Sequence, residues 1–253
     1  MIKKRVLLFV IFIYIQTTIK YSNSDDVIEF TSAESRTHLV ELFSSEGCSS
    51  CPKADAWLSA LRENPNLWKQ FVPIEFHVDY WNRLGWIDRL SKSIFTDRQN
   101  AYANEWLKSS VYTPGFVLDG LEWRPFGNSI PSNGQETDKV GILSARETGK
   151  YTFYAKFKPV KALATVRIYG ALLGNGLESK VNAGENSGKL LRHEFVVLSL
   201  VQQKMKFEKA EYTAVIELIP PLRELAKSFS AALWVTDGQS QKPLQVVGGD
   251  LKK

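Results

Sequence analysis

This chain of 253 residues contains only two cysteines, a count that excludes a small scaffold held together by many disulfides. Its 16 glycines and 10 prolines are too few for a collagen-like repeat. Hydrophobic residues make up 44% of the chain and charged residues 23%, which excludes a disordered chain and supplies enough apolar material for a core. The length fits one large domain or two small ones.

No strong excess of one charge remains once the first residues are set aside. The formal net charge is +5, and residues 1–24 carry four bases and no acids. Residues 25–130 carry 10 bases and 15 acids, whereas residues 131–253 carry 18 bases and 12 acids. A nearly neutral chain with an acidic first half does not fit a nucleic-acid partner, so we expect none.

A single long apolar run is present, and it lies at the start of the chain. Three bases at residues 3–5 precede ten apolar residues at 6–15. A membrane-spanning helix needs about 20 such residues, so this run predicts a secretory signal over residues 1–24. The alternative is an uncleaved N-terminal anchor through residues 6–15. Either reading predicts a secreted or periplasmic protein.

The two cysteines, Cys48 and Cys51, are three positions apart. Two cysteines placed at random in such a chain would fall so in about one case in a hundred, which indicates that they act as a pair. A disulfide across so short a loop removes little entropy from the unfolded chain, so a purely structural bond gains little stability. Redox chemistry and metal binding are the other two readings.

The first half of the chain alternates predicted strands and helices. Apolar runs and turn residues predict strands over 38–44, 72–78, 115–118 and 121–125, and helices from Pro52 to about 63, over 96–107 and over 136–146. Proline is tolerated in the first turn of a helix. The cysteine pair is therefore expected between a strand and the N-terminus of a helix.

After residue 149 the pattern changes to strands without clear helices. They are expected over 151–158, 164–173, 192–200, 211–219, 231–236 and 244–247. Such a series is typical of an antiparallel sandwich or barrel. We therefore predict an N-terminal segment at 1–24, one domain over 36–148 and a second domain over 149–253.

The order of elements over residues 36–148 resembles the thioredoxin fold. Thr113-Pro114 stands where that fold has a cis-proline facing the cysteine pair, and Asp119-Gly120 marks the following hairpin turn. The resemblance implies an α/β domain with a central mixed sheet and flanking helices, followed here by an antiparallel β-sandwich-like domain. It also implies a substrate-binding role for Thr113 and Pro114.

A narrower resemblance covers nearly all of the chain after residue 24. The segments VELFSSEGCSSCPKAD, FHVDYW, SVYTP, VLDG and GENSGKLLRHEFVV are similar to those of the secreted thioredoxin-like proteins catalogued as domain of unknown function 1223. Compared with ordinary thioredoxins, Glu41 lies one residue farther from the first cysteine than their buried acid does. Glu41 is retained as a supporting residue for proton transfer.

Cys48 and Cys51 are the predicted catalytic residues. A thiolate is the attacking species in disulfide exchange, and a helix N-terminus favours its negative charge. Cys48 is expected to be the nucleophile and the more exposed thiol, and Cys51 the resolving thiol. No organic cofactor is needed, because the cysteine pair itself carries the electrons.

Residues 77–81 supply further supporting candidates. His77 and Asp79 share one face of a strand, where His77 can pass a proton to Cys51 or form a buried hydrogen-bonded pair with Asp79. Tyr80 and Trp81 can line an apolar groove or pack between helix and sheet. His193, in a strand-like run, is read as structural.

These observations predict an exported thiol–disulfide exchange protein acting on a disulfide- or thiol-bearing protein or small thiol. Membrane contact is expected only through an uncleaved N-terminal segment. One alternative is a metal-binding or delivery module using Cys48, Cys51 and His77, because thiolates with imidazole suit Cu(I) or Zn(II). A second alternative is a non-catalytic interaction protein with the same fold.

Overall fold

The structure, a computed structural model, describes residues 27–127, 129–130, 139–219 and 226–252. The predicted signal at residues 1–24 lies outside this part. Fifteen strands and two α-helices lie within it. The helices are α1 (Cys51–Ala60) and α2 (Ser93–Glu105). The strands are β1 (Glu29–Thr31), β2 (His38–Ser44), β3 (Phe71–His77), β4 (Gly115–Leu118), β5 (Leu121–Trp123), β6 (Gly141–Gly149), β7 (Thr152–Pro159), β8 (Arg167–Asn175), β9 (Leu177–Lys180), β10 (Leu190–His193), β11 (Val196–Lys204), β12 (Lys206–Glu208), β13 (Glu211–Glu217), β14 (Ser228–Thr236) and β15 (Gln245–Asp250).

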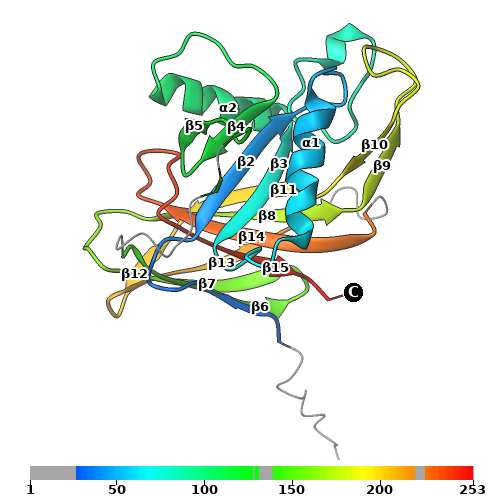
Figure 1. The fold of residues 1–253 in the computed structure, drawn as a ribbon. Coiled ribbons are helices and arrows are strands. Elements are labelled where there is room, and N and C mark those ends of the chain that lie inside the picture. Colours follow the sequence, from blue (N-terminus) through cyan, green and yellow to red (C-terminus); the bar gives the residue numbers. More distant parts are fainter. Residues whose placement is uncertain (1–26, 128, 131–138, 220–225, 253) are drawn as a thin grey trace, which may run out of the picture.

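The largest sheet has eight strands, in the order β15-β14-β8-β11-β3-β2-β4-β5 (Figure 1). Strand β3 is parallel to β2 on one side and to β11 on the other, and the remaining pairs are antiparallel. The β3–β11 contact includes a hydrogen bond from the Glu75 amide to the Phe195 carbonyl, at 2.9 Å. Strands from both halves of the sequence therefore form one sheet.

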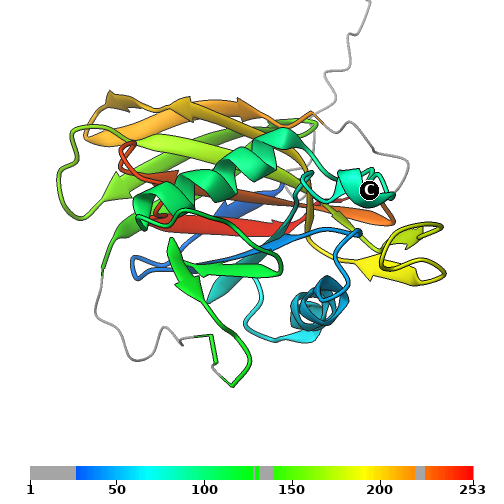
Figure 2. The ribbon, with the colours of Figure 1, turned by 90° about the horizontal axis from the view of Figure 1, so that it is seen from above.

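The strands β2 and β3 are buried along almost their whole length because both faces of the sheet are covered there. Successive side chains of a strand point to opposite faces. Ser44 faces α1, where its hydroxyl donates to Asp55, whereas Phe43 faces α2 and packs edge-on against Tyr102. The two helices consequently lie on opposite sides of β2, as the view from above shows (Figure 2).

A second, five-stranded sheet in the order β1-β6-β7-β13-β12 packs below the large one (Figure 1). Along β7 the burial alternates with a period of two, the pattern of a strand with one face in a core and one in water. Phe153 and Phe157 point inward and pack in one apolar cluster with Ile168 and Leu233 of the large sheet. The pair β9–β10 forms a separate two-stranded sheet.

The predicted fold class is wrong. We expected an α/β thioredoxin-like domain with flanking helices, followed by a separate antiparallel sandwich. The described chain is instead mostly strand, and the strands of its first half continue into a sheet that includes β8, β11, β14 and β15. Local sequence patterns find strands, but they do not tell which strands pair when their partners are far apart in the chain.

The helix predicted over 136–146 is also wrong where the structure describes it. Residues from Gly141 onward form β6, in which Gly141, Leu143 and Ala145 are buried and Ile142 and Ser144 between them are more exposed. That alternation has the period of a strand. The domain boundary predicted near residue 148 stays a prediction. None of the described helices has the length and apolarity needed to cross a membrane.

Candidate functional site

The cysteine pair lies at the junction between β2 and α1. Strand β2 ends at Ser44, a short loop follows, and Cys51 is the first residue of α1 with Pro52 in the first turn. Cys48 and Cys51 form a disulfide, with their Cα atoms 5.4 Å apart. Both residues are buried, at 1% and 0% exposure. The expected greater exposure of Cys48 is therefore absent in the disulfide form.

A loop from the second half of the chain closes over the disulfide. Asn186, buried between β9 and β10, donates from its amide to the carbonyls of Glu46 and Cys48, at 2.9 and 2.8 Å. The Ser49 amide donates to Glu185 of the same loop, at 3.1 Å. This contact fixes the backbone on both sides of Gly47. We call residues 181–189 the covering loop.

The Thr113–Pro114 peptide bond is cis, as predicted. Trp81 connects this segment to the cysteine loop. Its indole N–H donates to the Thr113 hydroxyl at 2.8 Å, and its Cβ would lie 3.1 Å from a Cβ added at Gly47. Trp81 thus lies next to the residue that precedes Cys48, and its indole N–H links it to Thr113.

Tyr80 and Asp79 belong to the α2 side of the molecule. The Tyr80 hydroxyl donates to the Gln99 amide oxygen at 3.2 Å, and burial raises the pKa of Tyr80 to about 12. Asp79 accepts a hydrogen bond of 2.6 Å from the Thr96 hydroxyl near the start of α2. Neither residue therefore joins His77.

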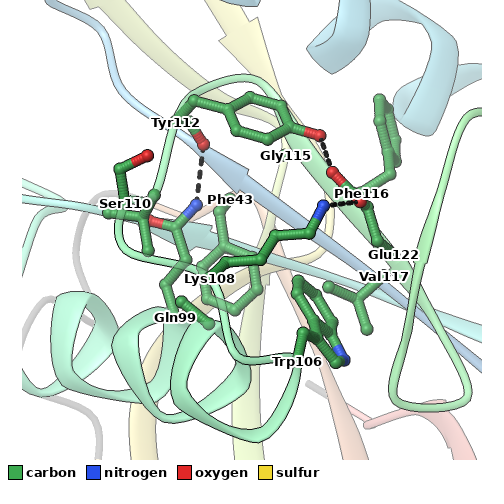
Figure 3. A pocket seen from close by; sticks show the side chains of 12 residues that line it. Phe43, Gln99, Trp106, Lys108, Ser110, Tyr112, Gly115, Phe116, Val117 and Glu122 are labelled. Atoms are coloured by element: carbon green, nitrogen blue, oxygen red, sulfur yellow. Dashed lines mark hydrogen bonds and ion pairs between the residues drawn. The ribbon is translucent and has the colours of Figure 1, made fainter.

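A pocket beside the cis-proline segment lies between α2 and β4 (Figure 3). Trp106 and Phe116 form part of its apolar wall, and Tyr112 and Lys108 reach across its mouth to Glu122. The hydrogen bond from Lys108 lowers the pKa of Glu122. The polar groups at the mouth are thus paired with each other.

Glu41 lies on the sheet face opposite α1. It forms a buried ion pair with Arg98, whose Nε and Nη2 donate to the carboxylate at 2.6 and 3.0 Å. The Tyr102 hydroxyl donates to the same carboxylate. The structure therefore brings Glu41 to α2 and not to the cysteines.

Behind the cysteine loop lies a cluster of titratable side chains, none of them more than 3% exposed. The members of this histidine–carboxylate cluster are Glu46, Asp55, Glu75, His77, Asp88 and His193.

Both ring nitrogens of His77 face carboxylates. Its Nδ1 is 2.7 Å from Asp88 and its Nε2 is 3.1 Å from Glu75. Burial lowers the pKa of an imidazole, but the charges of Asp88 and Glu75 outweigh that effect and raise the pKa of His77 well above its usual range. Asp88 also accepts from the amides of Glu46 and Leu90, each at 2.9 Å.

His193 lies edge-on to His77, with the ring centroids 4.8 Å apart. Its Nε2 is 3.6 Å from Glu46, and its Nδ1 is 3.6 Å from Asp55. Burial raises the pKa of Asp55 well above its usual range, and the charge of Glu75 raises it further. Because Asp55 follows Cys51 by one helical turn, the cluster begins directly behind the disulfide.

The sequence pointed to His77 but paired it with Asp79, whereas in the structure its aspartate partner is Asp88. Glu75, Asp88 and Glu46 were passed over, and His193 was read as structural. A signal was present in the run VPIEFHV, where Glu75 and His77 share one face of an otherwise apolar strand. Two ionisable groups on a buried strand need partners, and these come from elsewhere in the chain.

Together the fold and the site define a β-rich protein with a buried disulfide between cysteines three positions apart and a histidine–carboxylate cluster behind it. The chain belongs to the family described as protein of unknown function, DUF1223, whose profile matches residues 39–235. None of the curated proteins matches it.

Two solved structures have a similar fold. One is protein AGR_C_4864 from Agrobacterium tumefaciens, with 21% identity, a TM-score of 0.58, and 87% of this chain and 96% of that chain covered. The other is HBP35 of Porphyromonas gingivalis, with 14% identity, a TM-score of 0.55, and 88% of this chain and 77% of that chain covered. At these identities the likeness concerns the fold alone.

Proposed function

We propose that this protein catalyses thiol–disulfide exchange outside the cytoplasm, on a protein or small-molecule substrate that bears a thiol or a disulfide. The observation that supports it is the Cys48–Cys51 disulfide at the start of α1. Unpaired backbone N–H groups at a helix N-terminus favour a thiolate over a thiol. The export part of the proposal rests on the sequence pattern of residues 1–24.

The reaction needs only the two thiols of the reduced protein and one substrate disulfide. The Cys48 thiolate attacks a substrate sulfur, forms a mixed disulfide and releases the first substrate thiolate. The Cys51 thiolate then attacks the Cys48 sulfur and releases the second. The substrate gains two electrons and two protons, and the protein gains its disulfide. The reverse sequence oxidises a dithiol substrate.

Neighbouring groups assist the first step. The Ser50 hydroxyl lies 3.3 Å from the Cys48 sulfur and can donate to the thiolate. Next to the cis-proline, a groove is lined by Tyr112, Pro114, Phe116, Trp123 and Phe126. Phe126 is 63% exposed and Tyr112 is 45% exposed. An apolar segment of a substrate protein fits this groove, with Thr113 and Trp81 connecting it to the cysteine loop.

Single-cysteine variants test the proposal. Cys51→Ser removes the resolving thiol, so the reduced variant is expected to form a lasting mixed disulfide with a disulfide-bonded peptide or with oxidised glutathione. Cys48→Ser is the matched control and is expected to form none. Alkylation rates of the two reduced variants against pH should give Cys48 a pKa below the value of about 8.5 for a free thiol.

The proposal fails if Cys48 titrates at or above that value and no mixed disulfide accumulates. It also fails if the wild-type protein does not turn over any disulfide substrate while its reduced cysteine pair remains intact. The second result favours a non-catalytic interaction protein.

A further inference from the structure

We propose that Glu75, His77 and His193 bind a divalent transition-metal ion, with Zn²⁺ the best fit, and that Asp55 completes the site as fourth ligand. The four residues come from β3, β10 and α1. The site uses no cysteine, so it is independent of the proposed exchange reaction and differs from a metal site built on the CxxC thiols.

The first observation is a set of buried polar atoms without hydrogen-bond partners. They are Nε2 of His77, both ring nitrogens of His193, both carboxylate oxygens of Glu75 and Oε1 of Glu46. Buried polar atoms are almost always hydrogen-bonded, and exceptions concentrated in one place need an explanation. A metal ion accounts for the unpartnered atoms of Glu75, for Nε2 of His77 and for Nδ1 of His193, because it accepts a lone pair from each ligand atom.

The second observation is the spacing of these atoms. Ligand atoms of Glu75, His77 and His193 all lie within 4.8 Å of one another. His77 Nε2 is 3.1 Å from Glu75 Oε1, and His193 Nδ1 is 3.7 Å from that same oxygen. Asp55 adds an oxygen 3.6 Å from His193 Nδ1. Bonds of 2.0–2.1 Å to tetrahedral Zn²⁺ place neighbouring ligand atoms about 3.3 Å apart, close to the separations of 3.1, 3.6 and 3.7 Å, although the group as a whole extends to 4.8 Å.

The charge of the histidine–carboxylate cluster also supports a bound metal ion. The histidine–carboxylate cluster holds four carboxylates against two imidazoles, all buried. Within the described residues, the ion pairs of these carboxylates reach only His77 and His193. Ionised groups are rarely buried unless they are paired or coordinate a metal. A divalent cation between Glu75 and Asp55 stabilises the ionised form of both carboxyl groups.

The remaining two acids occupy the positions that support metal-binding histidines. Asp88 lies 2.7 Å from Nδ1 of His77, which leaves Nε2 for the ion. Glu46 lies 3.6 Å from Nε2 of His193, beyond hydrogen-bond distance, so its contact with this ring is electrostatic and leaves Nδ1 for the ion. A carboxylate on the second ring nitrogen fixes the tautomer and orientation of a ligand histidine. Because all four positions are protein side chains and buried, the site is structural and joins three elements.

Titration of Zn²⁺ into the chelator-treated wild-type protein tests the proposal, with calorimetry and metal analysis after dialysis as readouts. We expect one Zn²⁺ per chain. His193→Gln and Glu75→Gln are expected to lower the affinity by more than about 100-fold. His38→Gln is the matched control, because His38 binds Asp119 outside the cluster, and it is expected to bind as wild type does.

Two further measurements keep the test decisive even if a cluster variant fails to fold. Co²⁺ bound to the wild-type protein should give the visible spectrum of a tetrahedral site, and bound Zn²⁺ should raise the thermal midpoint. The double variant Cys48→Ser/Cys51→Ser should retain the metal. A folded wild-type protein that binds neither ion overturns the proposal. Loss of metal in the double-cysteine variant or in His38→Gln overturns it as well, because the ion then lies elsewhere.

Discussion

At the scale of single residues, Arg98 has an unusual environment. Its guanidinium carbon lies 5.1 Å from the centre of the Trp234 ring and 5.2 Å from that of Tyr102. Its only charged partner among the described residues is Glu41, which is fully buried. Removing one member of a buried ion pair leaves an uncompensated charge in the core, whereas removing both does not.

We therefore expect Arg98→Met to lower the free energy of unfolding by about 3–5 kcal/mol, because Glu41 is then unpaired. The double variant Glu41→Leu/Arg98→Met should recover most of that loss. Urea unfolding followed by tryptophan fluorescence measures both. As control, Arg62→Met breaks the more exposed pair with Asp250 and should change the free energy by at most about 1 kcal/mol. A double variant less stable than the single one would contradict the argument.

The candidate site residues that could be identified from the sequence are those that form short, recognisable motifs. Cys48 and Cys51 are three positions apart, and Thr113-Pro114 is a recognisable dipeptide. His193 could not be placed in the same way, because its neighbours in space are separated from it by more than a hundred positions of chain. Only the pairing of β3 with the chain after β10 brings His193 to His77.

At the scale of elements, we expect the covering loop to restrict access to the disulfide. Its contact with the cysteine loop is made largely by Asn186, whose amide group donates both of its protons to backbone carbonyls. Both cysteines are buried, so a reductant can reach the sulfur atoms only when neighbouring chain moves, and we expect this segment to be part of what moves, because it holds the backbone of Cys48. Local opening of this kind costs less free energy than global unfolding.

Replacement of Asn186 by alanine leaves two buried carbonyls without their donor. The oxidised variant should lose about 1–3 kcal/mol of stability and should be reduced by dithiothreitol faster than wild type. Stopped-flow or quenched-flow reduction assays measure the second effect. Ser187→Ala, at an exposed position of the same loop, is the control and should match wild type. Equal reduction rates for wild type and Asn186→Ala would show that this loop does not restrict access.

Most of the elements themselves could be predicted. The strands β2, β3 and β4 and the position of Cys51 at a helix start follow from apolar runs and from Pro52. The region of β6 was misread as helix although its buried and more exposed residues alternate from Gly141 to Arg146. A period of two fits those residues better than the helical period used for them.

At the scale of the whole molecule, the large sheet determines how cooperative the protein is. Strand β3 has β2 on one side and β11 on the other, so the first half of the chain presents an unpaired buried edge if the second half is missing. Unfolding of the full chain is therefore expected as a single transition, with far-UV circular dichroism and tryptophan fluorescence coinciding.

The pairing of β3 with β11 also predicts that a chain ending at residue 148 does not fold alone. It would expose the edge of β3 and the apolar faces that pack against Tyr169, Phe195 and Trp234. Size-exclusion chromatography and circular dichroism of this truncated chain check the expectation. Two resolved unfolding transitions, or a folded truncated chain, would instead support the domain boundary predicted near residue 148.

The arrangement of the histidines has one more consequence, which concerns spectroscopy. The chain has three histidines, two of them stacked edge to face in the cluster and the third, His38, paired with Asp119 near the surface. A proton magnetic resonance spectrum of the whole protein then contains only three sets of imidazole signals. Two of them are displaced by each other's ring currents, and His38 serves as an internal reference. The interior of this protein can thus be observed without isotopic labelling.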